Sequence, residues 1–125
     1  MSYDTWIREV MDATGLPREQ AERATRAFLR TLSMRLGNDE ARQLATQLPT
    51  ELQDCFAPTE PDVVKLSRDD FVSRIAEEAG ITPGQVRLTA QAVWAQARKT
   101  VSAGELADVQ SQLPDEIAAV IEGVR

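Results

Sequence analysis

The segment Gln-Leu-Pro-Thr-Glu at residues 47–51 recurs as Gln-Leu-Pro-Asp-Glu at residues 112–116. The same offset of 65 residues aligns residues 2–56 with residues 67–121 without a gap. Other identical pairs along this alignment are Ser2/Ser67, Asp4/Asp69, Gly15/Gly80, Gln20/Gln85, Ala27/Ala92 and Glu40/Glu105. Apolar positions match as well, so the repeated pattern is one of packing, capping and turning, and it predicts an internal duplication. We expect no reactive role for the repeated residues.

The size of the chain determines how the two copies are expected to pack. The chain has 125 residues, of which 42% are hydrophobic and 27% are charged, as is typical of a globular protein. We divide it into a first repeat at residues 1–56, a proline-containing linker at residues 57–66 and a second repeat at residues 67–125. Units below about 60 residues are only marginally stable alone. The repeats are therefore expected to share one core.

Each repeat is predicted to form four helices, which makes the chain an all-α bundle of about eight helices. Ser2 and Ser67 each precede apolar residues at helical spacing, and a serine hydroxyl can cap the first helix there. The second helix is the longest in each copy and is predicted over about residues 17–36 and 83–101. No strand pair or hairpin signal is present in the sequence.

The two shorter helices of each repeat also have recognisable start signals. Ser102 and Glu105 have the spacing of a capping box at the start of the second copy's third helix. Pro49 and Pro114 are predicted to begin the fourth helices, because proline fits the first helical turn. Cys55 falls on the apolar side of the first of these, which predicts a buried hydrophobic role and not a redox centre.

The charge of the chain argues against two classes of partner. The net charge is -6 and the pI is about 4.7, whereas nucleic acids and anionic membranes attract positively charged surfaces. Neither the start of the chain nor any later stretch resembles a signal peptide or the roughly 20 apolar residues of a membrane span. We therefore expect a cytoplasmic protein with no nucleic-acid or membrane partner.

The inventory of reactive residues predicts no catalytic, metal-binding or cofactor-binding residue. The chain contains no histidine, which removes the commonest general base and transition-metal ligand. Glycine-rich nucleotide loops and calcium-binding loops are also missing from the sequence. Asp70, Arg74 and Glu78 stand at i, i+4 and i+8, which favours an ion-paired surface ladder. Glu51 and Glu116 follow the helix-starting prolines, where a carboxylate favours the helix dipole.

An arginine stripe is the largest difference between the two copies. It consists of Arg23, Arg26 and Arg30, whose counterparts in the second copy are Leu88, Gln91 and Ala95. One interpretation is a solvated face on which Glu19 and Glu22 pair with Arg23 and Arg26 at i+4. The other interpretation is a contact site for an acidic partner or a small anion. Leu88, standing in place of an arginine, could mark an apolar contact.

The chain resembles the bacterial family known as domain of unknown function 2267. The resemblance is carried by the stretch at residues 15–24, Gly-Leu-Pro-Arg-Glu-Gln-Ala-Glu-Arg-Ala, by an aromatic residue early in each repeat and by the repeated Gln-Leu-Pro-x-Glu segment. It implies an all-helical, usually cytoplasmic protein and supplies no activity or catalytic residue. Pro17 departs from the pattern, where a capping acid or hydroxyl is expected.

These observations leave two functional hypotheses. The first is a non-enzymatic helical interaction or regulatory module that binds a protein partner or a second copy of itself. The alternative is a binder of a small ligand or anion, or a minor enzyme, with a pocket between the repeats. An apolar cavity of roughly 300 Å³ with convergent polar groups would favour the second hypothesis. A DNA-binding helix-turn-helix is disfavoured, because the third helix is acidic at its start.

Overall fold

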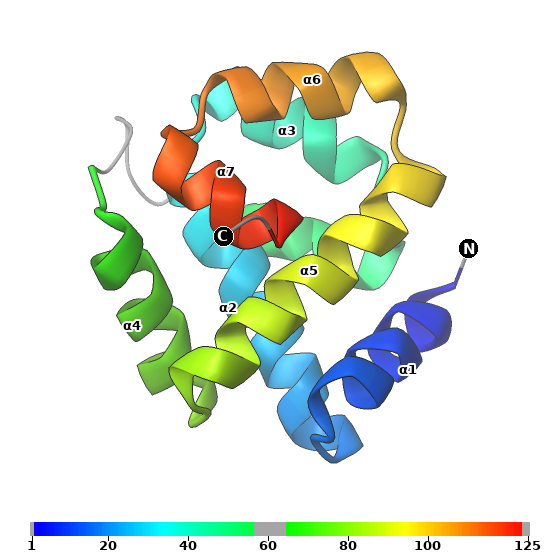
Figure 1. Cartoon of the computed structure of the whole chain (residues 1–125). Helices are drawn as coiled ribbons and strands as arrows, with labels where there is room; N and C mark the ends of the chain where they lie inside the picture. The colour runs from blue at the N-terminus through cyan, green and yellow to red at the C-terminus, as the bar shows by residue number, and fades with distance from the viewer. Residues whose placement is uncertain (1, 57–64, 124–125) are drawn as a thin grey trace.

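The computed structural model describes residues 2–56 and 65–123 and is helical throughout (Figure 1). Most of the predicted linker at residues 57–66 lies outside these described residues. The helices of the structure, in chain order, are α1 (Tyr3–Thr14), α2 (Arg18–Met34), α3 (Asn38–Thr46), the 3-10 helix η1 (Thr50–Phe56), α4 (Arg68–Ala79), α5 (Pro83–Thr100), α6 (Ala103–Ser111) and α7 (Asp115–Glu122). The predicted all-α bundle of about eight helices is confirmed, and the described ranges contain no strand.

The first helices of the two predicted repeats begin and end in the same way. The Ser2 and Ser67 hydroxyls each accept a hydrogen bond from the backbone N–H three residues later, at 3.3 and 3.1 Å. Gly15 and Gly80 end α1 and α4 with φ of 74° and 69°. A side chain with a Cβ is strained in this left-handed region, so glycine suits both positions.

Proline is the N-cap of two helices, and at Pro114 it lies one position earlier than predicted. Pro17 is the N-cap of α2 and provides no side-chain hydrogen bond, so the helix starts at Arg18. Pro114 is likewise the N-cap of α7 and does not lie in its first turn. The segment after Pro49 forms a 3-10 helix and not an α-helix. Proline supplies a fixed φ and no N–H, and both properties suit a residue just before a helix as well as one in its first turn.

The helices of the two predicted repeats are interleaved. α1 packs against α5 and α4 packs against α2, so the first helix of each repeat contacts the second helix of the other. α2 and α5 cross in the middle of the bundle, and α3 and α6 lie side by side (Figure 1). The α1–α5 and α2–α4 contacts are thus equivalent, as a twofold relation between two units would produce. The duplication itself stays a prediction.

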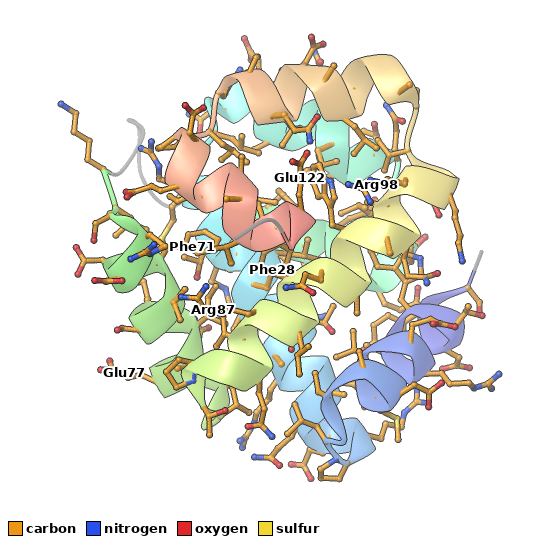
Figure 2. The ribbon with its side chains drawn as sticks, in the orientation of Figure 1. Phe28, Phe71, Glu77, Arg87, Arg98 and Glu122 are labelled. Atoms are coloured by element: carbon orange, nitrogen blue, oxygen red, sulfur yellow. The ribbon has the colours of Figure 1, made fainter. Side chains whose placement is uncertain are left out.

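The core is continuous across the two predicted repeats. Phe28 of α2 and Phe71 of α4 meet edge to face, with ring centroids 6.2 Å apart and an interplanar angle of 87° (Figure 2). Trp6 and Trp94 are among the largest fully or nearly fully buried side chains. Cys55 is buried as predicted, and burial raises the pKa of its thiol. Aromatic pairs of this geometry add about 1 kcal/mol beyond their buried area.

One finding concerns the surface of the helices. Among the described residues, no helix combines the length and the hydrophobicity needed to cross a bilayer. Leu88 of α5 is the large hydrophobic residue left exposed on the described surface, with 42% of its area accessible.

Candidate functional site

Two glutamates at matching positions of the predicted repeats are buried against each other. Glu40 lies in the first turn of α3 and Glu105 in the first turn of α6. Only 9% of Glu40 and 7% of Glu105 is exposed. Carboxylate oxygens of these two residues and of the exposed Asp108 all lie within 4.8 Å of one another. The corner between α3 and α6 therefore contains three acidic side chains, of which two are withdrawn from water. We call Glu40 and Glu105 the carboxyl pair.

Reciprocal glutamine hydrogen bonds bring the carboxyl pair together. The Gln47 Oε1 atom, at the end of α3, accepts from the Ser102 N–H at 2.8 Å. The Gln112 Oε1 atom, at the end of α6, accepts from the Gly37 N–H at 2.9 Å. Each bond links the end of one helix to the start of the other, so α3 and α6 run antiparallel. The two glutamines come from the two occurrences of the segment Gln-Leu-Pro-x-Glu, at residues 47–51 and 112–116.

Only one of the two hydrogen bonds of the predicted capping box forms at the start of α6, so the Glu105 carboxyl does not bond to the Ser102 N–H. The Ser102 hydroxyl accepts from the Glu105 N–H at 3.2 Å, as a capping box requires. The return bond is missing, because the Ser102 N–H donates to Gln47 instead. The Glu105 carboxyl is left near Glu40, and the remaining donor at the corner, the Gln112 amide, reaches the Glu40 Oε1 atom at a long 3.4 Å.

The carboxyl pair lacks the compensation that buried charges normally have. The Glu40 Oε2 and Glu105 Oε1 atoms are buried and have no hydrogen-bond partner among the described residues. No arginine or lysine of the described chain forms an ion pair with either glutamate or with Asp108. Burial, and then the neighbouring Glu40 and Asp108, raises the pKa of Glu105 to about 7. Ionising both of two adjacent buried carboxyl groups has a high free-energy cost, so the arrangement suits a proton shared between them.

The arginine stripe makes internal contacts that differ from the i+4 pairing with Glu19 and Glu22 expected for a solvated face. Arg26 donates two hydrogen bonds to the Asp54 carboxylate at 2.8 and 2.7 Å and one to the Glu51 carbonyl oxygen at 2.7 Å. The expected pairing of Arg26 with Glu22 is wrong, because Glu22 instead accepts from the Tyr3 hydroxyl at 2.6 Å and lies 3.4 Å from Arg18. The Arg26 guanidinium thus clamps η1 onto α2.

The other two arginines of the stripe differ from each other. Arg30 forms an ion pair with Glu78 of α4, across the two predicted repeats. The predicted surface ladder of Asp70, Arg74 and Glu78 is therefore wrong, because neither of its two i+4 ion pairs forms and Glu78 contacts another helix instead. Arg23 is exposed and forms no ion pair within the described residues, and its expected pairing with Glu19 is not formed. Of the three stripe arginines, Arg23 is therefore the one whose guanidinium forms no ion pair with a carboxylate of the described residues.

Other acidic residues have structural roles or face solvent. The Glu116 carboxylate accepts from the Arg68 N–H at 3.1 Å, so it stabilises the first turn of α4 in addition to lying in the first turn of α7. The Glu51 side chain is exposed in the first turn of η1. Glu77 is also exposed, and its side chain points away from the bundle in Figure 2.

A pocket of 410 Å³ opens beside the first copy of the repeated segment. It is lined by Ser2, Tyr3, residues 46–51 and Thr100. Burial and the hydrogen bond to Glu22 raise the pKa of Tyr3, so this phenol stays protonated. The pocket volume lies above the lower limit of roughly 300 Å³ for a ligand site, but its lining is mainly polar and not the apolar surface that the ligand-binding hypothesis expects.

The carboxyl pair was not recognised as a site from the sequence. The available signal was the identity of Glu40 and Glu105 in the alignment of the two copies. We expected no reactive role for repeated residues and assigned Glu105 to a capping box. Nothing in the local sequence shows that the two side chains face each other, since this depends on the antiparallel contact between α3 and α6.

The fold and the site define a class of small all-helical bundle with a buried carboxyl pair between two antiparallel helices. The comparison with known families places this chain more closely. It belongs to the family of uncharacterized conserved proteins called DUF2267, whose sequence profile matches residues 3–120. The resemblance inferred from the repeated segments is thereby confirmed. No curated protein matches the chain.

Proposed function

We propose that this protein is a non-enzymatic regulatory module, in which the corner between α3 and α6 changes its packing and so changes what the bundle binds. The expected partner is another protein or a second copy of the chain, in the bacterial cytoplasm. One observation carries the proposal: the carboxyl pair is buried without a cationic partner.

The carboxyl pair is costly for the fold, which is why it points to regulation. Burying a polar group without a hydrogen bond costs about 1–3 kcal/mol, and a buried charge costs more. The surrounding side chains Ala41, Leu44 and Val109 form an ordinary apolar core. Apolar residues of similar size at positions 40 and 105 would pack there without this cost. Groups whose surroundings disfavour their charge are common at functional positions, because they respond to small changes in conditions.

The arginine stripe remains part of this proposal in a narrower form. An acidic partner would have to displace Asp54 from Arg26 and Glu78 from Arg30. Arg23 needs no such exchange, because no described carboxylate engages it. We therefore propose Arg23 as the first contact of an acidic partner, with Arg26 and Arg30 released only after the bundle rearranges.

The experiment compares wild type with the Glu40→Gln plus Glu105→Gln double variant, which keeps the shape of the pair and removes its charge. The control is Asp39→Asn plus Asp115→Asn, which removes two exposed charges at the starts of α3 and α7. Partner capture from native lysate and solution mass are measured for all three proteins. We expect the double variant to change its bound proteins or its oligomeric mass while the control behaves as wild type. Identical results for all three proteins would contradict the proposal.

The pocket beside residues 46–51 favours a second candidate, the binding of a small polar ligand. Its volume and the hydroxyl groups of Ser2 and Thr50 suit a small ligand with several polar groups. A thermal-shift screen of polar metabolites against wild type and Thr50→Val tests this candidate. A ligand that stabilises wild type and not the variant would support it, whereas the lack of any stabilising ligand, or equal stabilisation of both proteins, would count against it.

A further inference from the structure

We propose that the carboxyl pair is a pH-sensitive latch, in which one proton shared by Glu40 and Glu105 holds α3 against α6 and loss of this proton loosens the two helices. This inference rests on the regulatory role proposed above and names the signal to which the same pair responds.

The geometry of the pair calls for one proton. Glu40 and Glu105 each have one buried oxygen atom without a partner, and carboxylate oxygens of the two residues lie within 4.8 Å. A carboxylate only accepts hydrogen bonds, so two ionised groups would face each other as acceptors alone. One proton turns a carboxylate into a donor, so that Glu105 and Glu40 can share a hydrogen bond between their carboxyl groups. When the proton leaves to water, two like charges remain in a poorly solvated corner.

The charges around the pair do not offset this repulsion. α3 contributes Glu40, and α6 contributes Asp108 in addition to Glu105. η1 packs against α3 and α5 packs against α6, yet no charged residue of η1 or α5 acts on Glu105. All the described charges that act on Glu105 are negative, and each favours the protonated form. The signal is therefore an increase in pH, and the responding elements are α3 and α6.

The position of the pair makes it a latch and not a general stability element. Glu40 and Glu105 lie between the two reciprocal glutamine hydrogen bonds that join the ends of α3 and α6. The central crossing of α2 and α5 and the packing of α1 and α4 do not involve the pair. Repulsion between the carboxylates should thus open the corner locally while the rest of the bundle stays folded.

The test is amide hydrogen exchange of the full chain at about pH 6 and about pH 8.5, corrected for the intrinsic exchange rate. In wild type, we expect amides of α3 and α6 to lose about tenfold or more of their protection at the higher pH, while α1 and α4 keep theirs. In Glu105→Gln, the amide can still donate to Glu40 without a titrating proton, so protection of α3 and α6 should stay high at both pH values. The control Asp39→Asn, an exposed acid on α3, should respond as wild type does.

Several outcomes overturn the latch. One is an equal response of all helices to pH, or no response of α3 and α6. Another is full restoration of protection at the higher pH by magnesium or calcium chloride alone, which would make a cation the occupant of the corner. If Glu105→Gln does not fold, carbon-13 NMR of the wild-type glutamate carboxyls decides the question. One carboxyl of the pair should then titrate well above the ordinary value of 4.5, and ordinary titration of both would refute the latch.

The failure of the latch can be separated from the failure of the regulatory proposal. Suppose that the protection of α3 and α6 in wild type does not depend on pH, but that Glu105→Gln still increases this protection. Only the shared-proton hypothesis is then wrong, because the pair still controls the packing of the corner. If neither pH nor the substitution affects the corner, both proposals are wrong.

Discussion

Replacing the two reciprocal glutamines should weaken the bundle by a predictable amount. Gln47→Ala removes the acceptor for the Ser102 N–H, and Gln112→Ala removes the acceptor for the Gly37 N–H. A net hydrogen bond contributes about 0.5–1.5 kcal/mol, and both donors lie near the surface where water can replace the glutamine. We therefore expect each substitution to cost about 0.5–1 kcal/mol and the double variant to cost about 1–2 kcal/mol, because the bonds lie at opposite ends of α3 and α6.

Urea unfolding followed by circular dichroism measures these losses. The midpoint should fall in each single variant and fall further in the double variant, with an unchanged denaturant slope, since the folded state keeps its size. Gln43→Ala is the matched control, because Gln43 is exposed on α3 and its side chain forms no hydrogen bond within the described residues. Equal midpoints for Gln47→Ala, Gln112→Ala and the control would refute the idea that the repeated segment ties the two helices together.

Three further predictions follow from the packing. Residues 1–56 expressed alone should be largely unfolded by circular dichroism, because α1 and α2 would lose their packing partners α5 and α4. Cooperative unfolding of this fragment with the stability of the full chain would contradict the shared core. Arg26→Gln should lower the free energy of unfolding in urea by about 1 kcal/mol, because it removes the hydrogen bonds to Asp54 and Glu51. Arg23→Gln should lower it by almost nothing, and equal effects of the two substitutions would show that the Arg26 contacts do not stabilise the fold. Cys55 should react slowly with iodoacetamide in the native protein and quickly in urea, because burial raises the pKa of its thiol and blocks access; rapid native labelling would contradict its burial.

Local rules predicted much of the fold. Ser2 and Ser67 were placed correctly at the starts of α1 and α4, because capping depends on a few neighbouring residues. The short-range rules erred by one position at Pro114. A proline can precede a helix or lie in its first turn, and its own sequence context does not separate the two.

Contacts between helices could not be predicted in the same way. The i+4 rule paired Arg26 with Glu22, but the guanidinium reaches Asp54 on a different element. Similarly, Glu78 forms an ion pair with Arg30 of another helix and not with Arg74, the partner that the i+4 spacing indicated. The carboxyl pair is the clearest case, because Glu40 and Glu105 are 65 positions apart and meet only after α3 and α6 pack antiparallel. Periodicity describes which face of a helix is apolar and contains no information about which helix covers it.

The dependence of stability on pH is the most direct test of the shared proton. In the folded protein the pKa of Glu105 rises from 4.5 to about 7, so between these values the folded state binds a proton that the unfolded chain has lost. Stability from this proton is fully present below about pH 4.5 and is lost as the pH rises through about 7. The difference between the folded and unfolded pKa of Glu105 corresponds to at most about 3 kcal/mol of folding stability. Solvent near the exposed Asp108 should reduce this contribution to about 1–2 kcal/mol.

The decisive measurement is therefore the difference in unfolding free energy between wild type and Glu105→Gln, from about pH 5 to about pH 8.5. Glutamine cannot lose a proton in this range, so the variant serves as a reference in which every other titrating group is retained. The shared proton predicts that wild type loses about 1–2 kcal/mol relative to the variant as the pH rises. A difference that stays constant over the whole range would show that Glu40 and Glu105 share no proton.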